Sequence, residues 1–131
     1  MSQFATRTEV PEGADVTHVA YLRRPDDTAH ASGDFTTYTF TVYDDEGVAI
    51  YTPPAAIAVS NGSPVYDTLQ TDGYWKGRNS TGYNFRATLT QATLVANAYE
   101  GGRTYRVVYE LNGGSTYGTV PVTFYDVSIS P

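Results

Sequence analysis

Apolar and polar residues alternate along several short segments of the chain, and this pattern predicts β-strands. The clearest segment is residues 35–43 (FTTYTFTVY), where Tyr38, Phe40 and Val42 share one face and threonines occupy the other. A period of two residues with one apolar face is typical of a strand that packs on a core and exposes its other side to solvent. Residues 44–47 predict a turn, so residues 48–51 are expected to return as the partner strand of a hairpin.

The same alternation recurs in residues 83–89 (YNFRATL) and 105–109 (YRVVY), and a weaker strand is predicted over residues 16–22. Short runs rich in glycine, proline, asparagine and aspartate separate these segments at close intervals. No window of about 15 residues repeats its apolar positions with a helical period, and residues 91–97 suffice only for a turn of helix. Many short strands between frequent turns favour an all-β sandwich or barrel.

The last segment, residues 117–130, begins with Val120, Val122 and Phe124 on one face. Unbroken alternation would then bury Asp126 and expose the apolar residues on either side of it. The sequence therefore predicts a β-bulge near residues 124–125, or a strand that crosses between two sheets. Because proline has no N–H to donate to a neighbouring strand, Pro121 is expected at a sheet edge or close to the start of its strand.

Chain length and composition favour one domain without covalent cross-links. The 131 residues suffice for one ordinary domain and include no cysteine, so neither disulfides nor cysteine–zinc sites are available. Twelve tyrosines and five phenylalanines provide rings that suit half-buried strands. Residues 1–13 are polar and predict a flexible N-terminal arm. Residues 14–131 predict a single antiparallel β-sandwich of about seven to nine strands.

The net charge of −6 disfavours binding to nucleic acid, because an acidic domain repels phosphate groups. The basic clusters, Arg23 with Arg24 and Lys76 with Arg78, are small and are expected to be solvated. No segment approaches the roughly 18 apolar residues of a membrane-spanning helix, so no membrane contact is predicted. The first residues also lack the apolar stretch of a secretory signal. If Met1 is the native start, the protein is expected to fold in a cytoplasm.

Residues 99–109 (YEGGRTYRVVY) resemble the corner before the sixth strand of immunoglobulin-like sandwiches, in its fibronectin type III form. In that motif an apolar residue precedes a glycine turn and then tyrosine-x-valine. Here Tyr99 takes the apolar place, Gly102 belongs to the turn and Tyr105 is the corner tyrosine. The family usually has leucine in place of Tyr99 and proline in place of Gly101. The resemblance implies an Ig-like sandwich in which the Tyr105 hydroxyl turns back to satisfy a carbonyl of the corner; the alternative is a core aromatic of another β fold.

The general character of the chain is similar to that of structural proteins of tailed phages, since it is small, rich in tyrosine, free of cysteine and without a signal. Those proteins include decoration, neck and tail components, which fold in the cytoplasm of the bacterial host and then join a shell or tube. The resemblance implies a virion protein that acts through contacts with other subunits, either as a homo-oligomer or as part of a larger complex.

No arrangement of residues in the sequence predicts catalysis. His18 and His30 are the two imidazoles, and no Gly-x-Ser-x-Gly motif accompanies them, so structural or surface roles are expected. The acidic residues 26–27 and 44–46 lie in predicted turns, where carboxylates usually bond to their own backbone. Paired acids for glycoside hydrolysis are the alternative, and a calcium loop would need regularly spaced aspartates that are missing here. The sequence thus predicts no enzyme, no cofactor and no metal site.

Residues 71–83 (TDGYWKGRNSTGY) form the most distinctive predicted surface, because they bring Tyr74, Trp75, Lys76, Arg78 and Tyr83 together in a glycine-flanked loop. Aromatic and arginine side chains are common anchors of protein–protein contacts, and exposed rings beside polar groups also bind sugars; a third possibility is that Trp75 fills the core. The proline-bearing last strand is the second expected contact, as an open edge that accepts an added strand. The sequence therefore predicts a non-enzymatic assembly module, with a carbohydrate-binding module for glycan recognition as the alternative.

Overall fold

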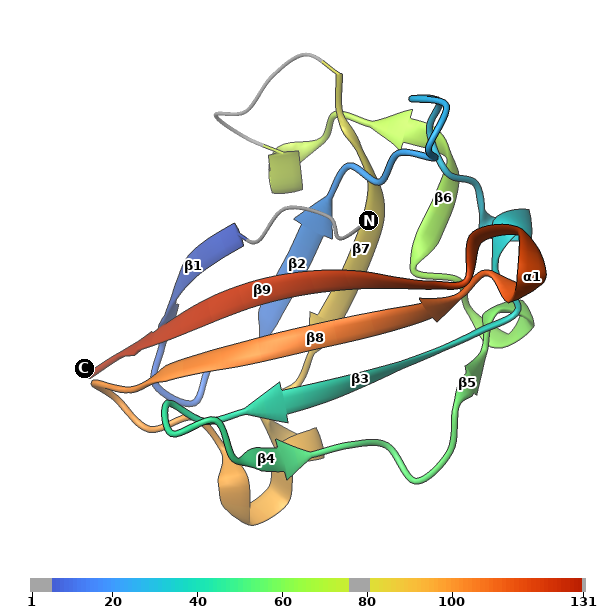
Figure 1. Ribbon diagram of the computed structural model, residues 1–131. Helices are drawn as coiled ribbons and strands as arrows, with labels where there is room; N and C mark the ends of the chain where they lie inside the picture. The colour runs from blue at the N-terminus through green and yellow to red at the C-terminus, as the bar shows by residue number, and fades with distance from the viewer. Residues whose placement is uncertain (1–5, 76–80, 131) are drawn as a thin grey trace.

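Two β-sheets packed face to face make up the fold (Figure 1). The computed structural model describes residues 6–75 and 81–130, and within these residues nine strands form sheets of six and three strands. The strands are β1 (Thr6–Pro11), β2 (Val16–Ala20), β3 (Thr37–Tyr43), β4 (Ala49–Tyr51), β5 (Ile57–Ala58), β6 (Val65–Gln70), β7 (Tyr83–Leu89), β8 (Thr104–Asn112) and β9 (Thr119–Ile129). The predicted all-β sandwich is confirmed.

The larger sheet has the strand order β1-β9-β8-β3-β4, with β5 also paired to β3, and the smaller sheet has the order β2-β7-β6. Neighbouring strands run antiparallel except β1 and β9, which run parallel. The connections include the short helical turns η1 (Ser32–Asp34), η2 (Val59–Asn61), η3 (Gly73–Trp75), η4 (Gln91–Asn97) and α1 (Gly114–Tyr117). Among the residues that the structure describes, no helix has the length and hydrophobicity that a membrane crossing requires.

The N-terminal segment contains a strand where the sequence predicts a flexible arm over residues 1–13. β1 lies within this range and runs parallel to β9. Val10 is buried, and the N–H of Glu12 donates to the carbonyl of Ile129 at 2.9 Å. The predicted arm is therefore wrong for β1, because pairing with a distant strand orders these residues although they carry no apolar stripe of their own. Residues 1–5 lie outside the described residues.

The alternating segments form strands as predicted. Along β8 every second side chain enters the core, namely Tyr105, Val107, Tyr109 and Leu111. On β3, Val42 is fully buried, whereas Tyr38 and Phe40 are half-buried and pack against the edge of the core. Three strands cannot cover the whole inner face of six, so part of the larger sheet near β3 is left accessible between the sheets.

β9 alternates without interruption, so the predicted bulge near residues 124–125 is wrong. Its buried side chains are Val120, Val122, Phe124, Asp126 and Ser128. The pairing with β8 keeps one register along the whole strand, which leaves the carboxylate of Asp126 fully buried. Pro121 lies near the start of β9, before β1 joins at Phe124, which is the second of its two expected positions. From Phe124 to Ile129, β9 lies between β1 and β8 and is not an open edge.

The buried carboxylate of Asp126 is satisfied by side chains from other parts of the chain. His18, on β2, places Nε2 2.9 Å from both carboxylate oxygens, and the hydroxyl of Tyr99 donates to Oδ2 at 2.7 Å. The other ring nitrogen of His18, Nδ1, lies 2.8 Å from the hydroxyl of Tyr109 on β8. Because an ionised carboxylate only accepts hydrogen bonds, Nε2 carries a proton and donates it to this bond. We call these four side chains the Asp126 network.

The Asp126 network connects the two sheets. His18 belongs to the smaller sheet, Asp126 and Tyr109 belong to the larger one, and all of the network's side chains are at most 2% exposed. The His18 ring also stacks on Phe124, with the ring centroids 4.5 Å apart. Burial, followed by the charge of Asp126, raises the pKa of the Tyr99 and Tyr109 hydroxyls, which therefore stay protonated. The network thus joins β2, β8 and β9 by hydrogen bonds that solvent does not reach.

Replacing Asp126 with alanine is expected to lower the free energy of unfolding by about 3–5 kcal/mol, because the His18 N–H and the Tyr99 hydroxyl lose their acceptor inside the core. Urea denaturation followed by circular dichroism measures the loss. The control Asp27→Asn removes an exposed ion pair with Arg23, and asparagine tolerates the φ of 73° at this position, so the change is expected to cost less than about 1 kcal/mol. Equal losses in the two variants would contradict a stabilising role for the network.

Candidate functional site

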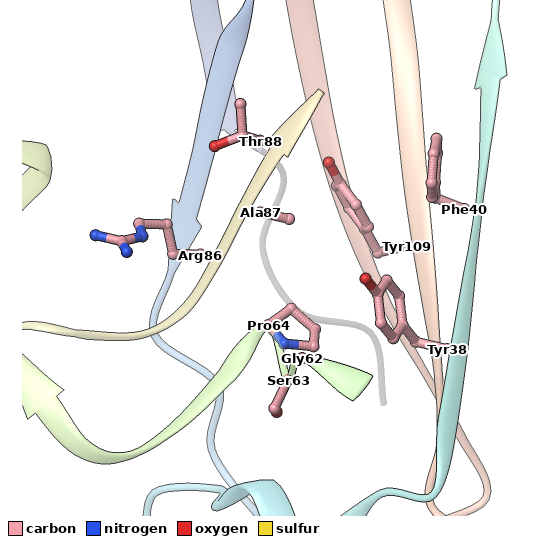
Figure 2. A pocket seen from close by; sticks show the side chains of 9 residues that line it. All are labelled: Tyr38, Phe40, Gly62, Ser63, Pro64, Arg86, Ala87, Thr88 and Tyr109. Carbon is pink, nitrogen blue, oxygen red and sulfur yellow. The ribbon is translucent and has the colours of Figure 1, made fainter. Parts of the chain in front are cut away.

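A pocket of about 220 Å³ opens between the two sheets beside β3 and β7. Its lining combines three aromatic rings with small and polar residues: Tyr38, Phe40, Gly62, Ser63, Pro64, Arg86, Ala87, Thr88 and Tyr109 (Figure 2). Figure 2 shows Tyr38 and Tyr109 reaching from the larger sheet toward Ala87 and Pro64 on the opposite side. The side chain of Arg86 points away from the pocket, so this residue lines it with its backbone.

The pocket exists because β6 accompanies only part of β7. The two strands match in register at two positions, with an irregularity between them. Beyond these positions, the N–H of Arg86 donates to the carbonyl of Pro64 at 2.8 Å. The chain bends next to Pro64, where Gly62 has a φ of 140°, a value that side-chain-bearing residues rarely adopt. The preceding residues belong to η2 and β5, and β5 pairs with β3 in the other sheet. The chain therefore crosses between the sheets at one end of the pocket.

Two tyrosines that line the pocket, Tyr109 and Tyr38, bring polar groups to it. Tyr109 lines it with its ring and bonds through its hydroxyl to His18, so the Asp126 network begins directly behind this residue. Tyr38 is half-buried, and burial raises the pKa of its hydroxyl, which remains able to donate a hydrogen bond. The pocket can accept one apolar group against its rings and a polar group at its mouth.

The predicted contact loop, residues 71–83, is only partly a surface. Tyr74 is 54% exposed, but Trp75 is 6% exposed and Tyr83 is fully buried. Trp75 and Tyr83 pack with Val19 in a small cluster separate from the main core. Of the three possibilities for Trp75, burial is therefore the one that the structure has. The exposed contacts expected of Trp75 and Tyr83 are wrong, because both rings are used in packing. Lys76 and Arg78 lie outside the described residues.

Arg86, which no pattern in the sequence singles out, organises this region. The guanidinium of Arg86 lies 5.4 Å from the ring centroid of Tyr66 and 4.9 Å from that of Tyr74. It also lies 3.9 Å from the carboxylate of Asp72, which accepts a hydrogen bond from the hydroxyl of Tyr83 at 2.8 Å. We call Arg86, Tyr66 and Tyr74 the Arg86 surface. The one feature of the sequence that could have indicated this surface is an arginine at an outward-facing position of an alternating strand.

A second arginine–tyrosine contact lies on the outer face of the larger sheet. The guanidinium of Arg106, on β8, lies 4.3 Å from the ring centroid of Tyr43 on β3. Tyr125 stands opposite Arg106 on β9 and is 37% exposed. We call Arg106, Tyr43 and Tyr125 the Arg106 surface. Since the Arg86 surface covers the outer side of the smaller sheet, the two surfaces lie on opposite sides of the sandwich.

The corner at residues 99–105 has the hydroxyl of its tyrosine turned back toward the chain before β8. The hydroxyl of Tyr105 accepts a hydrogen bond from the N–H of Glu100 at 2.9 Å, so its partner is an amide rather than the expected carbonyl. The rings of Tyr99 and Tyr105 are stacked with centroids 4.1 Å apart. Gly102 has a φ of 87°, a conformation that favours glycine and allows the turn. Tyr99, Gly102 and Tyr105 therefore act together in one structural unit.

The second histidine is also used inside the fold. His30 is 2% exposed, and its Nδ1 lies 2.7 Å from the carboxylate of Asp34. Arg24 donates two hydrogen bonds to the same carboxylate, at 2.9 and 3.0 Å. Burial alone would raise the pKa of Asp34, but the hydrogen bonds from Arg24 and His30 outweigh it and lower this pKa to about 2. The three side chains hold the segment between β2 and β3.

The acidic turn after β3 is satisfied by its own backbone and by one arginine. Asp44 accepts hydrogen bonds from the N–H groups of Glu46 and Val48, at 3.0 and 2.9 Å. Asp45 accepts from Arg103 at 2.7 Å. Within residues 6–75 and 81–130, no group of three or more histidine and acidic side chains is placed to hold a metal ion. These acids therefore have a structural use in the turn.

No protein-family model matches the chain, and no curated protein matches it in sequence. The Arg86 surface, the Arg106 surface and the pocket are the features from which a function is proposed below. Both surfaces combine arginine with tyrosine, and the pocket is lined by aromatic rings. Groups of this kind are enriched where proteins bind other molecules.

The carboxylate of Asp34 is expected to contribute to stability at neutral pH and to lose this contribution in acid. Its pKa is lower in the folded protein than the ordinary value of 3.8, so the contribution is present above that value and is lost as the pH falls to about 2. Urea midpoints measured between neutral pH and about pH 2 would show the loss. Asp34→Asn should flatten this part of the curve. An unchanged curve in the variant would contradict the assignment.

Tyr105→Phe is expected to lower the free energy of unfolding by about 1 kcal/mol, because the N–H of Glu100 loses its acceptor at the corner. Tyr125→Phe is the matched control, since its ring is exposed on the outer face and the change should be within about 0.5 kcal/mol. Thermal and urea unfolding measure both variants. An unchanged stability of Tyr105→Phe would show that the hydroxyl has no role at the corner.

Proposed function

We propose that the protein is a non-enzymatic building block of a larger assembly, and specifically a decoration, neck or tail component in the virion of a tailed phage. It folds in the cytoplasm of the bacterial host and then joins other subunits through protein–protein contacts. The observation that carries this proposal is the Arg86 surface, where one guanidinium lies over two tyrosine rings, one of which belongs to a residue that is more than half exposed. Tyrosine and arginine are enriched among residues that dominate binding energy at interfaces.

The Arg86 surface is suited to a contact because its geometry is formed before a partner arrives. Arg86 is positioned by two rings and by the carboxylate of Asp72, so few side-chain rotamers remain to be ordered on binding. The buried Trp75 and Tyr83 support it from beneath. A rigid aromatic and cationic patch of this kind favours a specific protein contact.

The Arg106 surface supplies a second contact on the opposite side of the sandwich. Two different contact surfaces on one subunit allow heterologous packing, in which each copy binds the next through unlike faces. Such packing closes into rings or extends into tubes, depending on the rotation between neighbours. This arrangement supports a homo-oligomer or a position within a larger complex.

The burial and hydrogen bonding of the two histidines support a non-enzymatic role. His18 lies in the Asp126 network and His30 bonds to Asp34, and both rings are at most 2% exposed. General acid–base catalysis by either ring would need direct reach to a substrate. Both histidines instead contribute hydrogen bonds that stabilise the fold.

We further propose that the sandwich is of the Ig-like type. The order β2-β7-β6 corresponds to strands B, E and D of that fold, and β9-β8-β3-β4 corresponds to G, F, C and C′. The bond from Glu100 to the Tyr105 hydroxyl, at the start of the strand that corresponds to F, supports the same assignment. The buried histidine–carboxylate pair joins the sheets in a chain that has no cysteine.

Glycan recognition is the alternative function, and the burial of Trp75 weakens it. The largest ring of the predicted loop is 6% exposed, and Tyr74 has Arg86 beside its ring. A sugar platform needs an open ring face, so a glycan would have to use other residues. A glycan array that shows selective binding, lost in Tyr74→Ala, would favour this alternative over assembly.

The assembly proposal predicts that the double variant Arg86→Ala, Tyr74→Ala weakens subunit association by at least about tenfold, because an anchor of the contact is removed. Sedimentation of the purified protein over a concentration series measures self-association. Mass spectrometry of purified virions from the organism or phage that encodes the protein measures whether the protein is incorporated into the particle. Arg23→Ala is the control, since Arg23 also lies near a tyrosine ring, that of Tyr21, but outside the proposed surfaces.

Two results together would overturn the proposal. One is a wild-type protein that stays monomeric at every concentration, and the other is its absence from purified virions. Reproducible turnover of a small molecule by the pure protein would separately contradict the non-enzymatic role.

A further inference from the structure

We propose that the edge of β7 beside the pocket accepts an extended segment of a partner protein, which adds as a short strand and inserts one large apolar side chain into the pocket. The inference rests on the proposed function, because it names the kind of partner that such a building block would bind. The proposed site consists of Ala87 and Thr88 of β7, with the rings of Tyr38 and Tyr109 opposite. The segment contributes backbone hydrogen bonds to β7 and a single anchor to the pocket.

The hydrogen-bonding direction of β7 can be derived from one bond. Positions in an antiparallel pair alternate between residues that bond to each other and residues that do not. The N–H of Arg86 donates to Pro64 on the β6 side, so Arg86 and its opposite residue on β2 form a non-bonded pair. Thr88, two residues further on, is therefore also in a non-bonded pair, with Thr17. The N–H and C=O of Thr88 consequently face away from β2, toward the pocket side.

No described residue pairs with β7 at Thr88 on that side. The register between β6 and β7 ends at Val65, and the backbone contact ends with the bond from Arg86 to Pro64. Thr88 is exposed, and it lines the pocket together with the backbone of Arg86. A strand edge with free donor and acceptor groups is a template for an added strand. The edge and the pocket thus form one continuous site.

The volume of the pocket favours a single side chain over a free small molecule. Small-molecule sites generally enclose roughly 300–1,000 Å³, and the pocket has about 220 Å³. A cavity of roughly 150 Å³ is large enough to bind benzene. The pocket is therefore large enough for a phenylalanine or leucine side chain, which would pack against the rings of Tyr38, Phe40 and Tyr109.

The alternation of the added strand defines the sequence pattern of the partner. A residue beside Ala87 directs its side chain into the pocket, because side chains at neighbouring positions of a sheet share a face. The residues before and after it point outward and are expected to be polar. One of them lies beside Thr88, and the other approaches Pro64, which already occupies the edge beside Arg86. The expected pattern is polar–apolar–polar in an extended chain.

The test uses the full-length protein labelled with ¹⁵N and the probe peptide acetyl-Lys-Thr-Phe-Thr-Lys-amide, with Leu and Ala in place of Phe as companions. The Phe and Leu peptides are expected to slow the exchange of the Thr88 amide and to shift the resonances of Ala87 and Tyr109. The Ala peptide is expected to bind at least about tenfold more weakly, because the anchor is removed. The affinities come from the same titrations.

Two variants separate the edge from the pocket. Thr88→Pro removes the outward N–H and should abolish binding, whereas the matched control Thr88→Ala keeps that N–H and should bind normally. Because proline within a strand can prevent folding, Ala87→Leu serves as the second variant. Its larger side chain occupies the pocket from β7, so it should weaken binding of the Phe peptide by at least about tenfold.

The inference is overturned if the Phe peptide, at about 1 mM, leaves the Thr88 amide unprotected. It is equally overturned if the Ala peptide binds as well as the Phe peptide, or if Ala87→Leu binds normally. A panel of free monosaccharides that shifts the pocket resonances when the peptides do not would assign the pocket to sugars instead. If the protein assembles but does not bind the peptide, the strand site fails and the proposed function remains. If it binds the peptide but never assembles, the proposed function fails.

Discussion

The burial of one carboxylate constrains the rest of the structure. Asp126 lies fully inside the sandwich, and a charge in that position is tolerated only with hydrogen-bonding partners of good geometry. His18 from the smaller sheet and Tyr99 from the segment before β8 supply them, and Tyr109 bonds to the far nitrogen of His18. A shift of one sheet relative to the other would separate His18 from Asp126 and from Tyr109. The network therefore specifies how the sheets stack, a role that apolar contacts alone fill less selectively.

The sequence predicts the elements of this fold much better than it predicts their partners. Alternation along β3, β7 and β8 correctly indicates strands, because their pattern is local. The predicted bulge in β9 is wrong because Asp126 looks unfit for a core until His18, 108 residues away, is placed beside it. The sequence pattern does not predict β1 for a similar reason, since a parallel partner from the other end of the chain orders a polar segment. Pairing between distant segments leaves no signal in a local pattern.

The candidate site, like the fold, could be predicted from the sequence only in part. The loop at residues 71–83 was identified from its composition, yet burial separates Tyr74 from Trp75 and Tyr83. Arg86, which organises the surface, lies outside that loop and is recognisable only once β7 is placed beside Tyr66 and Tyr74. The pocket could not be predicted at all, because it results from β6 leaving β7 early. The proposed strand site thus depends on what the two sheets leave uncovered, and the Asp126 network holds Tyr109, which lines that opening, in place.

The most direct test of the central claim is native-state hydrogen exchange, because it measures the opening free energy of each sheet separately. If the Asp126 network makes the two sheets one cooperative unit, the slowest amides of β2 and β7 will exchange with the same opening free energy as those of β8 and β9. That free energy will equal the global free energy of unfolding. A smaller sheet that opens at least about 1 kcal/mol more easily than the larger one, while the larger one stays protected, would contradict the account.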